Sequence, residues 1–374
     1  MVLPFVREFF ADVEKSSAFT RLPPHLREGA GRASVSGLTP TAKALLIALL
    51  QRTAARPVIV VTRGNREAED LTSLVQAFCE LTAGPSPETV ISLPTRDVLP
   101  FQNLSPHPEI QEARAIALWK IASGAAQIVI APGLSSAMRL RSAEYYAGQA
   151  RIAHRGETID AGELVQHLNS IGYNSVDVVE MPGEYAVRGG ILDVYPAESD
   201  RPLRVEFFGD EIESIRKFDP GTQRSSAEVD EAVLLPLTDT PVTEEVLAAV
   251  HARLSGKRIS GAEDIVEEAV RAGGVSVFPG WEFYAPLAGA GETLLDLLPG
   301  AAVLVDEPAD VHEEFERYWE RIEQSHERSG IGNLVRPEDL YLPPDSWKQG
   351  VAVRHGIDLE HLGVLFVPPS AEAV

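Results

Sequence analysis

Along residues 34–140, short apolar runs that are typical of strands alternate with longer apolar–polar patterns that are typical of helices. Three short aliphatic runs have the pattern of strands buried on both faces of a parallel sheet. They are residues 58–61, 90–93 and 127–130. Three helical patterns accompany them, at residues 41–51, 65–81 and 108–122, and the second has an amphipathic face. Alternation of strand and helix predicts a parallel sheet covered by helices.

Near residue 150 the pattern changes to closely spaced β segments. A short helix is expected at residues 161–171, and the β segments follow it at residues 176–180, 191–195, 203–208 and 211–218. Gly and Pro separate the segments, and connections this short favour antiparallel pairing. These residues therefore predict a separate β-rich unit.

After Pro241 the α/β pattern resumes. A short aliphatic strand is expected at residues 301–305, and a helix of about twenty residues from 309 has a single apolar stripe. The predicted fold class is α/β, a degenerate P-loop NTPase-like parallel sheet with helices on both faces, interrupted by an inserted β-rich α+β domain. The expected divisions are 1–144, 145–238 and 239–340, with 341–374 as a truncated connecting segment.

Composition narrows the function classes. The 374 residues have a formal net charge of −22, which disfavours a free-standing non-specific DNA binder. One cysteine, Cys79, excludes a disulfide framework within the chain, and we expect it to be a small buried apolar residue. We find no signal peptide and no apolar run that spans a bilayer, so we expect a cytoplasmic protein.

The segment from Gly37 to Ala44 lies where a phosphate-binding loop belongs, between a probable strand and a helix. A working loop needs glycine before its lysine and Ser or Thr after it, but Ala42 and Ala44 flank Lys43. Pro40 also removes a backbone N–H from the loop. We interpret the segment as an ordinary strand-to-helix turn, with Thr39 as the N-cap.

Asp306 and Glu307 end the aliphatic strand at 301–305, as the second half of a nucleotide site would. Without a magnesium-binding hydroxyl at Ala44 the two carboxylates have little to coordinate. We interpret Gly37, Lys43, Asp306 and Glu307 as a degenerate, inactive nucleotide site. The sequence shows no other catalytic arrangement and no metal-ligand spacing.

The stretch from Arg201 to Ile212 predicts a strand, a tight turn and a second strand. Period-two alternation places Arg204, Glu206 and Phe208 on the face that should be polar. Arginine and aromatic residues are typical anchors of protein interfaces. The alternative is that Phe208 turns into the core at the end of the hairpin. Arg188 precedes a Gly-Gly pair that is typical of a bulge or bend, and it lies near Arg204 if the strands from 191 and 203 are adjacent.

Several long motifs resemble the UvrB-homology region of the bacterial transcription-repair coupling factors (Mfd). They are residues 181–196, 204–216, 218–225, 97–109 and 293–299. UvrB itself keeps an intact phosphate loop and a tyrosine-rich hairpin, which this sequence lacks.

The resemblance implies an N-terminal segment whose insert recruits the damage sensor UvrA to RNA polymerase stalled at DNA lesions, in nucleotide excision repair. Carried over by motif, the UvrA contacts fall on Arg188, Arg204 and Phe208. No cofactor is expected for this segment. The full-length family members use ATP and magnesium in motor domains, and bind RNA polymerase and double-stranded DNA through parts that this sequence lacks.

Two other interpretations stay open. The chain is an ATP-dependent DNA helicase, translocase or UvrB-like enzyme if Lys43 and Asp306-Glu307 still bind nucleotide. It is a regulatory scaffold if the partner of its insert is an intramolecular C-terminal domain of the full-length protein. The segment itself is expected to bind protein and not to catalyse a reaction.

Overall fold

The computed structural model describes most of the chain. The described residues are 4–27, 31–54, 56–82, 84–241, 243, 246, 248, 279–329 and 335–361. Within these residues, no helix is both long and apolar enough to cross a membrane.

A six-stranded parallel sheet forms the body of the molecule. Its strand order is β1-β14-β13-β2-β4-β3. The strands are β1 (Ala33–Ser36), β2 (Val58–Thr62), β3 (Val90–Ser92), β4 (Ile128–Pro132), β13 (Ala302–Asp306) and β14 (Gly356–Glu360). The parallel sheet expected from the aliphatic runs is therefore confirmed.

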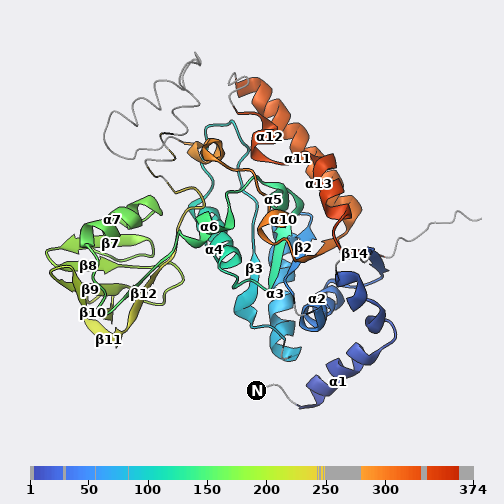
Figure 1. Cartoon of the computed structure of the whole chain (residues 1–374), viewed down its shortest axis with the longest axis horizontal. Helices are drawn as coiled ribbons and strands as arrows, with labels where there is room; N and C mark the ends of the chain where they lie inside the picture. Colours follow the sequence, from blue (N-terminus) through green and yellow to red (C-terminus); the bar gives the residue numbers. More distant parts are fainter. Residues whose placement is uncertain are drawn as a thin grey trace, which may run out of the picture.

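Helices cover both faces of this sheet (Figure 1). One face packs on α2 (Pro40–Ala54) and α3 (Asn65–Thr82), and the other packs chiefly on α4 (Pro108–Ala122) and α11 (Pro308–Ser329). The shorter helices of the body are α1 (Pro4–Lys15), α5 (Gly133–Ala137), α6 (Ala143–Ala147), α10 (Leu294–Leu297), α12 (Pro337–Leu340) and α13 (Pro344–Ala352). Its 3-10 turns are η1 (Phe19–Arg21), η2 (Pro23–Leu26), η3 (Pro87–Thr89), η4 (Trp281–Phe283) and η5 (Ala285–Ala288).

Alternate residues of β2, β3, β4 and β13 enter different cores. Val58 and Val60 belong to the core under α2 and α3, whereas Ile59 and Val61 belong to the core on the other face. A strand covered on both faces must be apolar at every position, which is why these strands read as continuous aliphatic runs.

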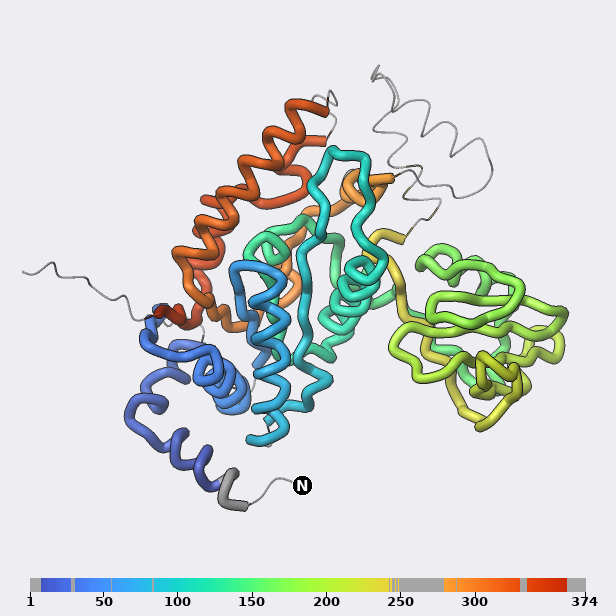
Figure 2. Tube along the Cα trace, turned by 180° about the vertical axis from the view of Figure 1, so that it is seen from behind, coloured from blue at the N-terminus to red at the C-terminus, as the bar shows by residue number. Residues whose placement is uncertain are grey.

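The second unit lies to one side of the body, where Figures 1 and 2 show it next to α4. Its sheet has the order β11-β10-β9-β8-β7-β6, and α7 (Ala161–Ser170) packs with it. The strands are β6 (Asn174–Ser175), β7 (Glu184–Arg188), β8 (Ile191–Val194), β9 (Leu203–Phe208), β10 (Glu211–Phe218) and β11 (Ser225–Val229). Apart from the β6–β7 pair these neighbours are antiparallel, as expected.

The chain enters and leaves this unit through one antiparallel pair. The pair joins β5 (Arg151–His154) to β12 (Glu231–Leu234). The second unit also packs on the body through a small apolar cluster, in which Ile116 on α4 contacts Ala197 and Leu235 of the second unit.

The expected β segment at residues 176–180 is wrong. The unit instead has the strand β7, which we did not predict because Gly and Pro residues on both sides of it are typical of turns. Gly189 and Gly190 form the two-residue turn of a hairpin, because Arg188 pairs with Ile191 across them. Gly189 has a φ of 60°, a conformation that glycine adopts readily. Of the bulge or sharp bend expected at this pair, the structure has the bend.

The expected connecting segment from residue 341 is also wrong as far as residue 361. These residues form α13 and β14, and β14 lies inside the parallel sheet between β1 and β13. Residues 362–374 lie outside the described part of the chain.

Candidate functional site

The strand register places Arg188, Arg204 and Phe208 on one face of the second sheet. Arg188 is opposite Ile191, and Ile191 is opposite Glu206 on the next strand. Glu206 lies between Arg204 and Phe208 in β9, so period-two alternation gives all of these side chains the same direction. The strands β8 and β9 are adjacent, so the condition for Arg188 to lie near Arg204 is met, but Arg188 belongs to β7 and β8 lies between the two arginines.

Phe208 is an exposed aromatic residue on this face. Its side chain is 78% exposed, and it ends β9 at a turn formed by Gly209 and Asp210. The alternative in which Phe208 turns into the core is therefore excluded. Its neighbour Phe207 takes the core side and packs partly against the buried cluster of this unit. An exposed phenylalanine at a hairpin end is a feature that packing within the unit does not explain.

Arg204 is held within the unit. Its Nε and Nη2 atoms donate to the two carboxylate oxygens of Asp193, at 2.7 and 2.8 Å. Its guanidinium carbon also lies 4.9 Å from the centre of the Phe218 ring. The hydrogen bond to Asp193 raises the pKa of Arg204 above its ordinary value. The charge of Arg204 is thus already paired, and only 19% of its side chain is exposed.

Sequence reasoning missed Asp193, which is 5% exposed. The sequence contained a sign of this buried carboxylate, because Asp193 lies between the apolar residues Leu192 and Val194 in a strand. An acidic residue at such a position needs a cation on the neighbouring strand. Arg204 is directly opposite it in the register.

Arg188 is exposed and differs from Arg204 in its partners. Its Nη2 atom donates to the backbone oxygen of Asp177, in the loop before β7. Across the described residues we find no carboxylate paired with Arg188. Arg188 is therefore the arginine of this face whose charge is most available to a partner.

The second candidate site lies at the carboxyl end of the body sheet. Gly37 follows β1 with a φ of 84°, and its N–H donates to the backbone oxygen of Glu360 at 3.0 Å. Thr39 accepts a hydrogen bond from the N–H of Ala42, which confirms it as the N-cap of α2. The helix begins at Pro40 and directs Lys43 toward the end of β13.

Lys43 meets both carboxylates that were predicted from the sequence. Its Nζ atom lies 2.5 Å from Asp306 Oδ1 and 2.5 Å from Glu307 Oε1. Burial by itself lowers the pKa of Lys43, but the bonds to Asp306 and Glu307 outweigh it and raise that pKa. Burial raises the pKa of Glu307, but Lys43 and the N–H of His361 together outweigh it and lower that pKa. The pocket beside them measures about 260 Å³, and it also contains Arg63, Glu67 and Asp310.

Cys79 is buried on α3, and burial raises the pKa of its thiol to about 11. The thiol is thus protonated at neutral pH, as a small apolar core residue should be. No group of three or more His, Cys, Asp or Glu side chains is arranged to hold a metal within the residues that the structure describes.

Comparison with known proteins gives these surfaces a context. The family model described as the UvrB interaction domain matches residues 152–239, which include the whole second sheet. The transcription-repair-coupling factor of Haemophilus influenzae is 29% identical over 319 residues, or 83% of this chain. The chain is a homologue of the transcription-repair-coupling factors.

Further relatives in this family agree. The factor of Myxococcus xanthus is 30% identical over 339 residues, which are 87% of this chain. That of Escherichia coli is 31% identical over 210 residues, which are 56% of it. The chain spans only about a quarter of the length of the relatives that match most of it, 27% of the Haemophilus protein and 28% of the Myxococcus protein.

Proposed function

We propose that the second unit binds the damage sensor UvrA through the face that contains Arg188, Arg204 and Phe208. Residues 145–238 form the UvrA-binding insert in this proposal, and residues 1–144 and 239–340 contribute the two parts of the α/β body. The single observation that supports it best is the 78% exposure of Phe208 beside two arginines. The match to the UvrB interaction domain and the relatives in transcription-coupled repair support the choice of partner.

The three residues have different roles in this proposal. Phe208 is an apolar anchor for a partner pocket, since aromatic anchors dominate binding energies at interfaces. Arg188 contributes an accessible positive charge to an acidic partner. Arg204 shapes the face, because Asp193 and Phe218 fix its guanidinium in the sheet.

Titration of UvrA onto the chain tests the proposal. Phe208→Ala is expected to weaken binding about 10- to 30-fold, the range of an interface hot spot. The free energy of unfolding should stay within about 0.5 kcal/mol of the wild type, because the side chain is exposed. Arg188→Ala is expected to weaken binding without loss of stability and to reduce its salt dependence.

Phe9→Ala is the matched control, because Phe9 is also exposed, at 63%, but lies on α1 of the body. It should bind UvrA as the wild type does. Arg204→Ala is a weaker test, since it leaves the buried Asp193 unpaired and is expected to cost about 2 kcal/mol of stability. Equal affinity of the Phe208→Ala variant and the wild type would remove the site assignment.

We also propose that the body is an NTPase-like fold whose nucleotide site is degenerate. Lys43 is engaged by Asp306 and Glu307, so it faces acidic groups where a working site presents it to phosphates. Ala44 supplies no hydroxyl for magnesium. Calorimetric titration with ATP and Mg²⁺ should show no binding, whereas saturable magnesium-dependent heat would favour the helicase-like alternative.

In the full-length relatives, we propose that contacts with RNA polymerase and double-stranded DNA are made outside the matched quarter of their length. ATP-driven motion along DNA would belong to the same regions. The part described by this chain then supplies the link to UvrA at polymerases stalled on lesions.

A further inference from the structure

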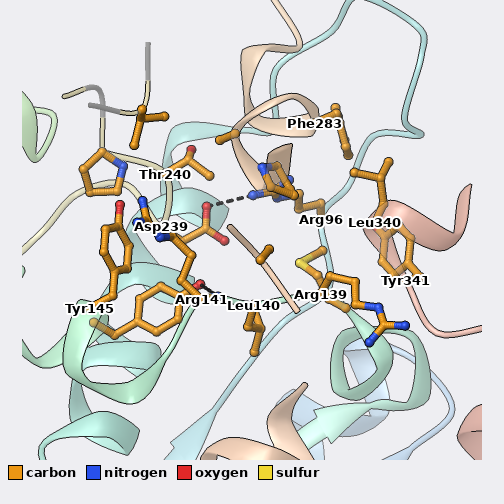
Figure 3. A pocket seen from close by; sticks show the side chains of 17 residues that line it. Arg96, Arg139, Leu140, Arg141, Tyr145, Asp239, Thr240, Phe283, Leu340 and Tyr341 are labelled. Carbon is orange, nitrogen blue, oxygen red and sulfur yellow. Dashed lines mark hydrogen bonds and ion pairs between the residues drawn. The ribbon is translucent and has the colours of Figure 1, made fainter. Parts of the chain in front are cut away.

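A small cavity lies where the second unit joins the body. Its walls come from the segment that leads into the unit, Arg139 to Tyr146, and from the segment that leads out, Asp239 to Pro241. Arg96, Phe283 and Tyr341 of the body close it on the other side (Figure 3). The cavity measures about 30 Å³, which is room for one or two water molecules, and it opens to solvent.

A buried ionic network forms one wall. Asp239 accepts from Arg96 Nη2 at 3.0 Å and from Arg114 Nε at 2.7 Å, and all three side chains are at most 6% exposed. Burial raises the pKa of Asp239, but the two arginines outweigh it and hold that pKa below its ordinary value. A single carboxylate therefore faces two guanidinium groups.

Two buried polar atoms of this wall have no hydrogen-bond partner among the described residues. They are the Nε atom of Arg96 and the hydroxyl of Tyr341, whose side chains are 5% and 1% exposed. Leaving a buried donor unsatisfied typically costs about 1–3 kcal/mol. Both residues line the same cavity.

The charges around the cavity favour an anion. Arg139 and Arg141 lie at its rim, and the guanidinium of Arg141 stacks 3.8 Å from the centre of the Tyr145 ring. Asp239 is the one carboxyl residue among the described residues that line the cavity. Glu282, which lies near Arg96, accepts a hydrogen bond from Ser105 Oγ, and burial raises its pKa. In a chain with a net charge of −22, this is a local concentration of guanidinium groups.

We propose that a small oxyanion, a carboxylate or phosphate group, enters this cavity from its open side and places one or two of its oxygen atoms against the Tyr341 hydroxyl and Arg96 Nε. A guanidinium N–H donates a charge-assisted hydrogen bond to either kind of oxyanion, and the Tyr341 hydroxyl adds a second donor. The anion would satisfy both unpaired donors and offset the excess positive charge of the wall.

The position of the cavity gives such binding a consequence for the second unit. Because its walls include both connecting segments, a bound anion would join them to the body. Anion binding is thus expected to stiffen the junction on which the orientation of the second unit depends.

Thermal unfolding of the chain in sodium phosphate, sodium acetate and sodium chloride at matched ionic strength tests the proposal. A saturable rise of Tm in phosphate or acetate over chloride is expected, and the anion that saturates at the lower concentration identifies the phosphoryl or the carboxylate form. In Tyr341→Phe the concentration for half saturation should rise roughly tenfold, as the loss of one charge-assisted hydrogen bond predicts.

Tyr341→Phe also has a diagnostic effect without the anion. Removal of a hydroxyl that has no partner should leave Tm in chloride unchanged or raised, whereas a structural hydrogen bond would give a lower Tm. Arg141→Gln should weaken the anion effect as well, and Arg66→Gln, on an exposed position of α3, should not. The proposal is overturned if phosphate and acetate act like chloride, if both pocket variants respond as the wild type does, or if Tyr341→Phe lowers Tm in chloride.

Discussion

Lys43 is 3% exposed and donates to two carboxylates that are each about one-fifth exposed. A buried ammonium group without a partner costs several kcal/mol, so Lys43 depends on these carboxylates as they depend on it. The same residues that suggest a nucleotide site in the sequence therefore have a role in stability. Removing Lys43 leaves Asp306 and Glu307 without their ammonium partner, while the N–H of His361 still donates to Glu307.

Lys43→Met is expected to destabilise the chain by about 2–3 kcal/mol at pH 7. The pKa of Glu307 is lowered in the folded state, so its stabilising effect is present above the ordinary carboxyl pKa, about 4.3, and is lost as the pH falls through the folded value. The variant lacks this contribution. Its deficit should thus shrink between about pH 5 and pH 3, which urea unfolding at each pH measures.

Lys15→Met is the matched control, because Lys15 pairs with Asp12 on the surface, where both side chains are about three-quarters exposed. It should change stability by less than about 1 kcal/mol at any of these pH values. A deficit of Lys43→Met that stays constant with pH would show that the ion pairs do not contribute to stability in the expected way.

The sequence was informative about where single residues point and not about their partners. Alternation in β9 placed Phe208 on the outer face, and the structure agrees. It also placed Arg204 there, but the pairing with Asp193 depends on which strands are neighbours. The Lys43 contacts span more than 260 positions in the sequence. The motifs of a nucleotide site grouped Lys43 with Asp306 and Glu307, but they did not predict that these residues pair directly.

Among the elements, β14 shows why the carboxyl-terminal part of the body sheet was missed. Its residues alternate Ile357, Asp358, Leu359 and Glu360, which is atypical of a strand in the middle of a parallel sheet. Asp358 is tolerated there because Arg32, ahead of β1, donates to both of its carboxylate oxygens. The pairing partner lies 326 positions away, beyond the reach of a periodicity argument.

The beginning of β14 gives a test of this strand. A Cβ atom at Gly356 would lie 1.8 Å from the backbone oxygen of Val303, its partner residue on β13. Gly356→Ala must therefore separate β13 from β14, and a loss of at least about 2 kcal/mol is expected in urea unfolding. Val305 and Leu359 amides should also exchange faster with deuterium.

Gly300→Ala is the control for this variant. Gly300 has no atom within 4 Å of an added Cβ, and it lies in the turn before β13. Its stability should stay within about 0.5 kcal/mol of the wild type. If Gly356→Ala were as stable as Gly300→Ala, then β14 would not pair with β13 as described.

On the scale of the whole molecule, two sheets share a junction that one ionic network stabilises. Arg114 of α4 and Arg96 after β3 both belong to the body, and Asp239 belongs to the segment that returns from the second unit. The sequence predicted the two units from the change to closely spaced β segments near residue 150. It did not predict this network, because its members are 125 and 143 positions apart.

Asp239→Asn is expected to destabilise the body by about 3–5 kcal/mol, since it leaves two buried guanidinium groups without a carboxylate. Trp281, Trp319 and Trp347 lie in the body, and Trp119 packs at its contact with the second unit, so tryptophan fluorescence during urea unfolding reports on the body and the junction. Hydrogen exchange should quicken in α4 and less in β8 and β9, which make no contact with the network.

Asp230→Asn provides the comparison, because Asp230 is 85% exposed and pairs with Arg155 on the surface of the second unit. It should shift the fluorescence transition by less than about 1 kcal/mol. If Asp239→Asn behaved in the same way, the network would not stabilise the junction. If hydrogen exchange quickened equally in α4 and in β8 and β9, the two units would unfold as one. The substitution at Asp239 would then destabilise the second sheet as much as the body.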